Sequence, residues 1–419
     1  MATASVFRCR NGRGAAREIG VLGRRRSDEV SNRMMIRGWR SHCGSRANCP
    51  PAVANPGWLR RLTRWKRPPG LDIVGYLLSE IGLGEAARLM VAALDAGGVP
   101  AGLINAPLPG RMSEPALAER LAASSRQHRT ALTICGATEL GMFASRTCRC
   151  QVNIAYPFWE LPTFPAAWKP MLDGFDAYWA PTTFIQNALA SAQPKAVTLV
   201  PQPIHLPEEP RRQAFQGPLK FYTFFDFDSY ASRKNPFGAI RAFRAAFPTG
   251  REDARLLVKA RGRDAEAGRQ TELVALARQD PRIEIIDKTL TRDEMSTLMD
   301  ACNVFVSLHR SEGFGLGCAE ALARGKGVVA TDFGGTRDFI NEQTGYPVGF
   351  TKVTLKADDY VGAEGNYWAE PSVEHAASIM RRLYDDPGQI GERALAGFAH
   401  LKAHNSFESV GRLIKASLA

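Results

Sequence analysis

Two glutamates stand eight positions apart around a glycine-rich stretch, and this spacing is the strongest chemical signal in the sequence. Glu312 precedes Gly313-Phe-Gly-Leu-Gly317, and Glu320 follows it. The apolar run Val304-Phe-Val predicts a buried strand before the glycines, and the residues from Cys318 to Arg324 predict a helix after them. Such a unit binds anions because the helix N-terminus presents unpaired N–H groups. Two carboxylates there would repel a phosphate, so we expect them to bind hydroxyl groups beside it.

The sequence from Glu312 onward resembles the signature of the retaining family 4 glycosyltransferases, which have the GT-B fold. That signature reads Glu-Gly-Phe-Gly-Leu, a second Glu eight residues after the first, and then Ala-(Leu/Met)-Ala-x-Gly-x-Pro-Val; here Gly327 stands where proline is usual. The resemblance implies that Glu312 contacts hydroxyls of the donor sugar and that Glu320 binds the ribose hydroxyls. It further implies that the backbone N–H groups of Gly315, Leu316 and Gly317 bind the donor diphosphate.

The same family usually has two cations that bind the diphosphate, one in Gly-Arg at a strand end and one in Lys-Gly or Lys-Asn further on. Lys234-Asn matches the second element, whereas Asp226-Phe-Asp228 occupies the place of the first. We therefore expect Arg233 to substitute for the missing arginine, since a desolvated diphosphate needs cations and arginine can bind it with two parallel bonds. Asp226-Phe-Asp228 also resembles the metal motif of the other glycosyltransferase fold, but its position after a strand in the diphosphate half favours coincidence, and no metal site is expected.

Three further sites are weaker candidates. The strand from Leu71, the Gly82-x-Gly84 loop and the helix after it open a Rossmann-like half, without the third glycine or the acid that a dinucleotide site needs. The resemblance implies that this loop approaches the sugar or the acceptor, so Gly82 and Gly84 are site candidates, with a tight structural turn as the alternative. His309 precedes Glu312 in the same loop and is a candidate donor contact, with a structural role as the alternative.

A proline-punctuated aromatic loop from Tyr156 to Trp168 follows a predicted strand, at the sheet edge where open α/β sheets bind ligands. Glu160 is the acid in this loop and a candidate base toward an acceptor hydroxyl, with a capping or structural role as the alternative. Its Trp-Glu-Leu-Pro sequence resembles a bacterial polysaccharide-assembly branch of the family. Many family members have a donor-binding histidine in this region, whereas this chain has none between residues 129 and 204.

Composition narrows the class of protein further. The chain has 419 residues, of which 45% are apolar and 23% charged, values typical of a globular protein with two domains. Residues 1–70 carry 16 basic and 3 acidic side chains, whereas residues 71–419 carry 38 and 39, so the net charge of +12 comes from the N-terminal tail. This distribution disfavours nucleic-acid binding by the folded part. No apolar run reaches 18 residues, and the eight cysteines have no C-x-x-C spacing, which favours free thiols in a reducing cytoplasm.

The predicted organisation is α/β, with two Rossmann-like domains facing across a cleft in the GT-B arrangement. We expect a basic disordered tail over 1–68, two domains over 69–205 and 206–385, and C-terminal helices over 386–419. The resemblance implies that the first domain binds the acceptor, that the second binds the nucleotide sugar, and that the C-terminal helices pack back toward the first domain. Within the tail, Trp58, Leu62 and Trp65 share one helical face bordered by basic residues. This segment is predicted either to contact an anionic membrane surface or to be a solvated basic linker.

The resemblance implies a retaining glycosyltransferase of polysaccharide biosynthesis. It would move a hexosyl group, with mannosyl as one candidate, from a nucleotide diphosphate sugar to a saccharide or a lipid-linked saccharide acceptor. The donor is a substrate, and no cofactor, metal or nucleic acid is expected; the location is cytoplasmic, with candidate peripheral contact at the inner face of the membrane. The alternatives are another GT-B enzyme, such as a phosphorylase or an epimerase, and a non-catalytic scaffold that binds sugar nucleotides.

Overall fold

The computed structural model describes residues 67–108, 117–122, 128–147, 152–210, 215, 217–262 and 268–418. From Arg64 to Ala419 the chain forms one compact unit. The prediction of a disordered tail over 1–68, including its amphipathic segment around Trp58, falls almost entirely outside the described residues. None of the helices in the described ranges is long and apolar enough to cross a membrane.

The first half of this unit is a parallel sheet of six strands in the order β2-β1-β3-β4-β5-β6. Its central strands are almost fully buried, as expected for parallel strands covered on both faces. The strands are β1 (Leu71–Gly75), β2 (Ala101–Asn105), β3 (Thr130–Gly136), β4 (Val152–Phe158), β5 (Ala177–Ala180) and β6 (Val197–Leu199). The helices are α3 (Gly82–Gly97), α4 (Ala118–Ala122), α5 (Leu140–Thr147), α6 (Lys169–Leu172) and α7 (Thr183–Ala192), with the 3₁₀ turns η3 (Ala137–Glu139) and η4 (Ala166–Trp168).

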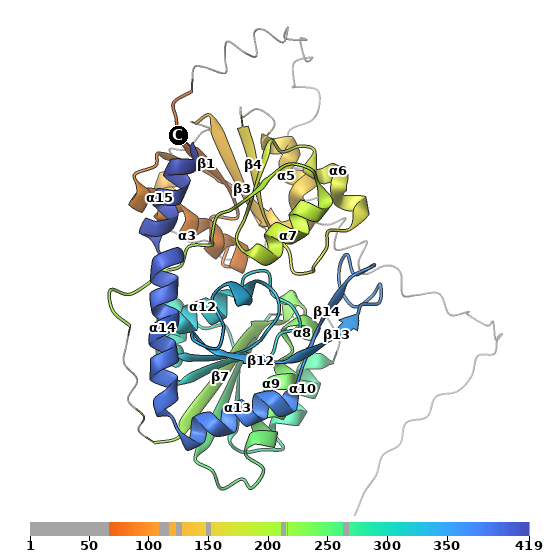
Figure 1. Cartoon of the computed structure of the whole chain (residues 1–419), viewed down its shortest axis with the longest axis vertical. Helices are drawn as coiled ribbons and strands as arrows, with labels where there is room; N and C mark the ends of the chain where they lie inside the picture. The colour runs from red at the N-terminus through yellow and green to blue at the C-terminus, as the bar shows by residue number, and fades with distance from the viewer. Residues whose placement is uncertain are drawn as a thin grey trace, which may run out of the picture. The chain divides into compact units, whose positions relative to one another are not determined.

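The second half repeats this plan, with a parallel sheet in the order β12-β11-β10-β7-β8-β9. Its strands are β7 (Leu219–Asp226), β8 (Ala254–Arg261), β9 (Ile283–Asp287), β10 (Val304–Ser307), β11 (Gly327–Thr331) and β12 (Tyr346–Val348). Its helices are α8 (Ala231–Lys234), α9 (Pro236–Ala246), α10 (Arg269–Ala277), α11 (Arg292–Asp300), α12 (Leu316–Ala323) and α13 (Val373–Asp385), with the 3₁₀ turns η5 (Phe227–Ser229) and η6 (Gly335–Asp338). The two predicted Rossmann-like halves are therefore present, and Figure 1 shows helices on the faces of each sheet.

The strand order places the glutamate loop at a defined position. In the second sheet the chain order reverses between β7 and β10, which lie side by side. Open α/β sheets bind ligands beyond the carboxyl ends of the strands at such a switch point. The segments that leave β7 and β10 at this end carry Arg233, Lys234 and Glu312, so the topology brings the predicted cations and the first glutamate to one edge.

The last two helices contact different halves of the unit. Helix α14 (Gly388–His404) packs on α12, and α15 (Phe407–Leu418) packs on α3, beside which it lies in Figure 1. Gly97 and Gly411 let α3 and α15 approach closely, since a Cβ atom on Gly411 would collide with the carbonyl oxygen of Ala93. Val410 and Ile414 of α15 join the buried core of the first half.

Two local predictions were wrong. The sequence after Tyr346-Pro-Val predicts irregular structure up to Trp368, but the segment contains the antiparallel pair β13 (Phe350–Thr354) and β14 (Tyr367–Pro371). Gly82 and Gly84, predicted in a loop before the helix, lie in the first turn of α3. The helix starts there because Ile81 is extended at its N-cap, and Gly84 is required because a Cβ atom would meet the carbonyl oxygens of Ser79 and Tyr76.

Candidate active site

The loop that carries Glu312 is packed tightly between β10 and α12. Gly315 has a φ of 86°, a left-handed conformation that favours glycine, and it begins α12 without a side-chain cap. A Cβ atom on Gly335, in η6, would collide with the carbonyl oxygen of Gly313, so the loop and η6 touch through their backbones. Gly315 therefore leaves the first backbone N–H groups of α12, those of Leu316 and Gly317, without a side-chain cap at the positive end of the helix.

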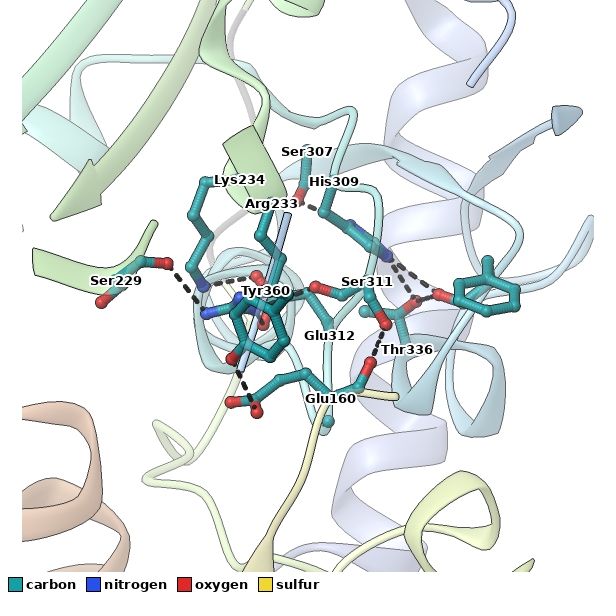
Figure 2. Close-up of polar contacts among 12 residues, drawn as sticks. Glu160, Ser229, Arg233, Lys234, Ser307, His309, Ser311, Glu312, Thr336 and Tyr360 are labelled. Atoms are coloured by element: carbon teal, nitrogen blue, oxygen red, sulfur yellow. Dashed lines mark hydrogen bonds and ion pairs between the residues drawn. The ribbon is translucent and has the colours of Figure 1, made fainter. Parts of the chain in front are cut away.

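Glu312 forms an ion-pair cluster with the two predicted cations, which come from α8 (Figure 2). Its Oε2 lies 3.2 Å from Nη1 of Arg233, and its Oε1 pairs with Nζ of Lys234. Burial alone would raise the pKa of Glu312, but Lys234 and Arg233 outweigh it and lower the pKa to about 2. Glu312 is thus a carboxylate at neutral pH, although its side chain is only 11% exposed.

Asn235 holds the segment that carries the cations against the segment that carries Glu312. It has a φ of 51°, and its Nδ2 donates to the carbonyl of Leu308 at 2.9 Å, while its Oδ1 accepts from the N–H of Gly238 and caps α9. One side chain therefore fixes both the start of α9 and the distance between α8 and the loop after β10.

Arg233 is buried and keeps unused hydrogen-bonding capacity. Its Nη1 also donates to the carbonyl of Ser311 at 2.9 Å, and its Nη2 donates to the carbonyl of Ser229 at 3.3 Å. Its Nε has no hydrogen-bond partner among the described residues, and an unpaired buried donor of this kind suits a ligand. Burial alone would lower the pKa of Arg233, but the carboxylate of Glu312 outweighs it and raises the pKa, so the guanidinium stays charged.

Glu160, from the loop after β4 in the first half, reaches the same cluster (Figure 2). The hydroxyl of Ser311 donates to the backbone carbonyl of Glu160, and the hydroxyl of Tyr360 donates to its Oε2 at 3.1 Å. The structure therefore brings together four of the predicted site residues, Glu312, Arg233, Lys234 and Glu160, from segments far apart in the sequence.

Glu320 lies in a different environment, on α12 and half-buried. Burial raises its pKa to about 7, and the carboxylate of Glu85 on α3 adds to this effect, whereas Arg324 and Arg292 oppose it. Arg292 in turn pairs with Glu85 at 3.1 Å. Glu320 therefore takes up a proton near neutral pH, unlike Glu312, and a protonated carboxyl group can donate as well as accept a hydrogen bond.

His309 is held by protein partners on both sides of its ring. Nδ1 lies 2.9 Å from the hydroxyl of Ser307, and Nε2 lies 2.9 Å from the carbonyl oxygen of Phe333. Burial lowers its pKa, so the imidazole is neutral at pH 7. These contacts connect β10 to the loop that packs on Glu312, and they are the contacts expected of the structural alternative.

The remaining predicted positions have the following surroundings. Gly82 is exposed with open space around it. Leu316 and Gly317 form the first turn of α12, and a Cβ atom on Gly317 would lie 2.8 Å from the ring of Phe224. Asp226 pairs with Arg261 at 3.0 Å and caps η5. Among the residues that the structure describes, no three histidine, cysteine or acidic side chains are grouped so that they could hold a metal ion.

Sequence reasoning missed two site residues, Tyr360 and Ser311. Tyr360 lies between β13 and β14, where no periodic pattern marks an element, and Ser311 is an ordinary loop residue in sequence. Ser311 was detectable in principle, because it directly precedes Glu312. Tyr360 left no such signal, since its contact with Glu160 joins residues 200 positions apart.

Comparisons with known proteins give one family match and several similar solved structures. Residues 230–359, which include Arg233, Lys234, Glu312 and Glu320, match the family described as Glycosyl transferases group 1. No curated protein sequence matches the chain. Similar solved structures include Anabaena HepE in complex with UDP and glucose, which is 13% identical, with 84% of this chain and 99% of that chain covered and a TM-score of 0.59. Another is sucrose-phosphate synthase from Thermosynechococcus elongatus, at 16% identity, 84% and 98% coverage and a TM-score of 0.58.

A glycosyltransferase from Rickettsia africae is a third similar structure, at 14% identity, 83% and 98% coverage and a TM-score of 0.57. At these identities the likeness shows the fold, and the predicted GT-B fold is confirmed over most of the chain. The family match over 230–359 and the GT-B fold together support a glycosyltransferase.

Proposed function

We propose that the protein transfers a hexosyl group from a nucleoside diphosphate sugar to a saccharide or lipid-linked saccharide, with retention of the anomeric configuration. The observation that carries this proposal is the cluster of Glu312 with Arg233 and Lys234 beside the uncapped N-terminus of α12. Two cations and a helix end on one side suit a diphosphate, and a carboxylate beside them suits sugar hydroxyls. In this assignment the second half binds the donor and the first half binds the acceptor.

The cluster suggests how donor binding proceeds. Without donor, the carboxylate of Glu312 neutralises Arg233 and Lys234. A donor diphosphate competes for the same two cations, and its sugar hydroxyls then donate to Glu312 in their place. The unpaired Nε of Arg233 offers the incoming phosphate a further donor.

The same groups account for catalysis of the bond-breaking step. As the bond from the anomeric carbon to the diphosphate breaks, negative charge builds on the leaving diphosphate. Arg233, Lys234 and the first N–H groups of α12 stabilise that charge, and one preorganised donor is typically worth about 3 kcal/mol. We propose that these groups supply the positive charge without a metal ion. Double displacement is not part of the proposal, because Glu312 is held by two cations rather than poised as a nucleophile.

Glu160 is proposed as the base that takes the proton of the acceptor hydroxyl, since it is the acid that the first half contributes to the cluster. Glu320 is proposed to contact the ribose of the donor. We further propose a role in polysaccharide biosynthesis in the cytoplasm, with peripheral contact between the segment around Trp58 and an anionic membrane. This part of the proposal rests on the sequence resemblance and on the basic tail.

The function is tested with the full chain and a panel of UDP-glucose, UDP-galactose, UDP-N-acetylglucosamine and GDP-mannose, with octyl glycosides as acceptors. UDP-glucose comes first because the similar Anabaena structure holds UDP and glucose. We expect one donor to raise the melting temperature of the protein and to be turned over with release of nucleoside diphosphate. The rate of this release should be the same with and without EDTA. NMR should find the donor's anomeric configuration retained in the product.

Glu312→Ala should abolish turnover, whereas Glu252→Ala should not. Glu252 is the matched control because it also pairs with two cations, Arg282 at 3.1 Å and Arg381 at 3.5 Å, away from the site. Binding of a donor without turnover would favour a non-catalytic scaffold, and phosphate-dependent release of sugar phosphate without nucleotide would favour a phosphorylase.

A further inference from the structure

Tyr360 connects the two sides of the proposed site, although it lies outside the motifs that suggested the function. It stands in the segment between β13 and β14 and is 7% exposed. Its hydroxyl donates to Oε2 of Glu160 at 3.1 Å, and its ring lies under the guanidinium of Arg233 with 5.9 Å from Cζ to the ring centre (Figure 2). One side chain thus contacts the carboxylate on the acceptor side and the cation on the diphosphate side.

The tyrosine hydroxyl is a fixed donor at neutral pH. Burial raises the pKa of Tyr360 well above its usual value, and the nearby Glu160 carboxylate adds to this effect. The proton therefore stays on the phenol, and the Glu160 carboxylate accepts the bond. Because Ser311 holds the backbone carbonyl of Glu160 as well, both the main chain and the side chain of this glutamate are held by residues of the second half.

The segment that carries Tyr360 is itself anchored firmly. Asn366 is 2% exposed; its Oδ1 accepts from the N–H and the hydroxyl of Thr163 at 3.0 and 2.8 Å, and its Nδ2 donates to the carbonyls of Thr163 and Gly362 at 3.1 Å each. Gly362 has a φ of 69°, and a Cβ atom there would lie 2.9 Å from the ring of Trp159. The loop of Glu160 and the segment of Tyr360 are therefore locked together by backbone and side-chain contacts.

We propose that Tyr360 is a positioning residue that orients the carboxylate of Glu160 toward the acceptor hydroxyl and fixes its position relative to Arg233. This inference rests on the proposed function. In the step it serves, the acceptor oxygen bonds to the anomeric carbon and the bond to the diphosphate oxygen breaks, with its electron pair passing to the diphosphate. The proton of the acceptor hydroxyl moves to Glu160, which later returns it to water.

Tyr360→Phe tests this proposal, because it keeps the ring against Arg233 and removes only the hydroxyl. We expect kcat for transfer from the active donor to an octyl glycoside to fall about 10- to 100-fold, the scale of a misplaced catalytic group. The donor Kd should stay within about twofold, since Tyr360 does not act on the donor through its hydroxyl. Tyr346→Phe is the matched control, because Tyr346 is also buried and donates one hydrogen bond, to the carbonyl of Gln389 at 2.9 Å.

A double-mutant cycle separates positioning from simple packing. If Tyr360 acts through Glu160, then Tyr360→Phe should lower kcat in the wild type but not further in Glu160→Gln. Three outcomes would overturn the inference and leave the proposed function standing. They are an unchanged kcat in Tyr360→Phe, the same relative loss of kcat in the wild-type and Glu160→Gln backgrounds, and a donor Kd that rises together with a lower melting temperature. If the wild type neither binds nor turns over any nucleotide sugar, both are overturned.

Discussion

The ion-pair cluster at Glu312 makes a quantitative prediction about stability. Glu312→Gln keeps the size of the side chain and removes its charge. Since one pKa unit is worth about 1.4 kcal/mol, lowering the pKa from 4.5 to about 2 corresponds to about 3 kcal/mol of favourable interaction at pH 7. The variant should therefore lose about 3 kcal/mol of unfolding free energy, which is the scale observed when one partner of a buried pair is removed.

The pH dependence identifies the cause of this loss. Because the pKa of Glu312 is lower in the folded than in the unfolded chain, its contribution is present above about pH 4.5 and is lost as the pH falls toward about 2. The difference between wild type and variant should therefore shrink to about half at pH 3. Urea unfolding followed by tryptophan fluorescence at pH 7 and at pH 3 measures both values.

A second measurement separates the charge from the fold. Glu312→Gln frees Arg233 and Lys234 from their internal partner. The nucleoside diphosphate of the active donor, which has a diphosphate but no sugar, should therefore bind at least as tightly as to the wild type in a titration. Glu252→Gln, away from the site, should leave this binding unchanged. The reasoning is refuted if Glu312→Gln is as stable as the wild type at pH 7, if the loss is the same at both pH values, or if binding of the nucleoside diphosphate weakens.

Two further predictions concern other parts of the unit. The raised pKa of Glu320 makes its ionisation destabilising as the pH rises from about 4.5 to about 7. After allowance for its partial exposure, Glu320→Gln should therefore be about 1–2 kcal/mol more stable than the wild type at pH 8, and no more stable at pH 4.5. Equal gains in stability at both pH values in urea unfolding would contradict this prediction. Gly411→Ala should cost about 1–3 kcal/mol through its collision with Ala93, measured as a lower melting temperature, whereas Gly391→Ala in α14, with open space around it, should cost nothing.

The fold was largely predictable because its central strands are buried on both faces. Val304-Phe-Val and Val328-Val-Ala are continuous apolar runs, and each forms a strand of the second sheet. The side chain of Thr182 accepts the N–H of Ile185 at the start of α7, the contact expected of a threonine at an N-cap. The hairpin of β13 and β14 was missed because β13 is largely exposed and its residues show no buried face.

The site was predictable only in part, for a related reason. The family resemblance implied sugar and diphosphate binding by Glu312, Arg233 and Lys234, but not that the three pair with one another. That contact depends on β7 and β10 being neighbours in the sheet, which local sequence does not encode. Tyr360 was missed because its role comes from a tertiary contact with Glu160 and from a segment without periodic structure.

The position of α15 has a consequence for how the protein is made. Val410 and Ile414 complete the core around Leu71 and Ile73, yet the ribosome adds them only after the whole second half. Until then the nascent first half exposes the apolar face of α3 that α15 later covers. We therefore expect the core of the first half to be completed only after the second half has been synthesised.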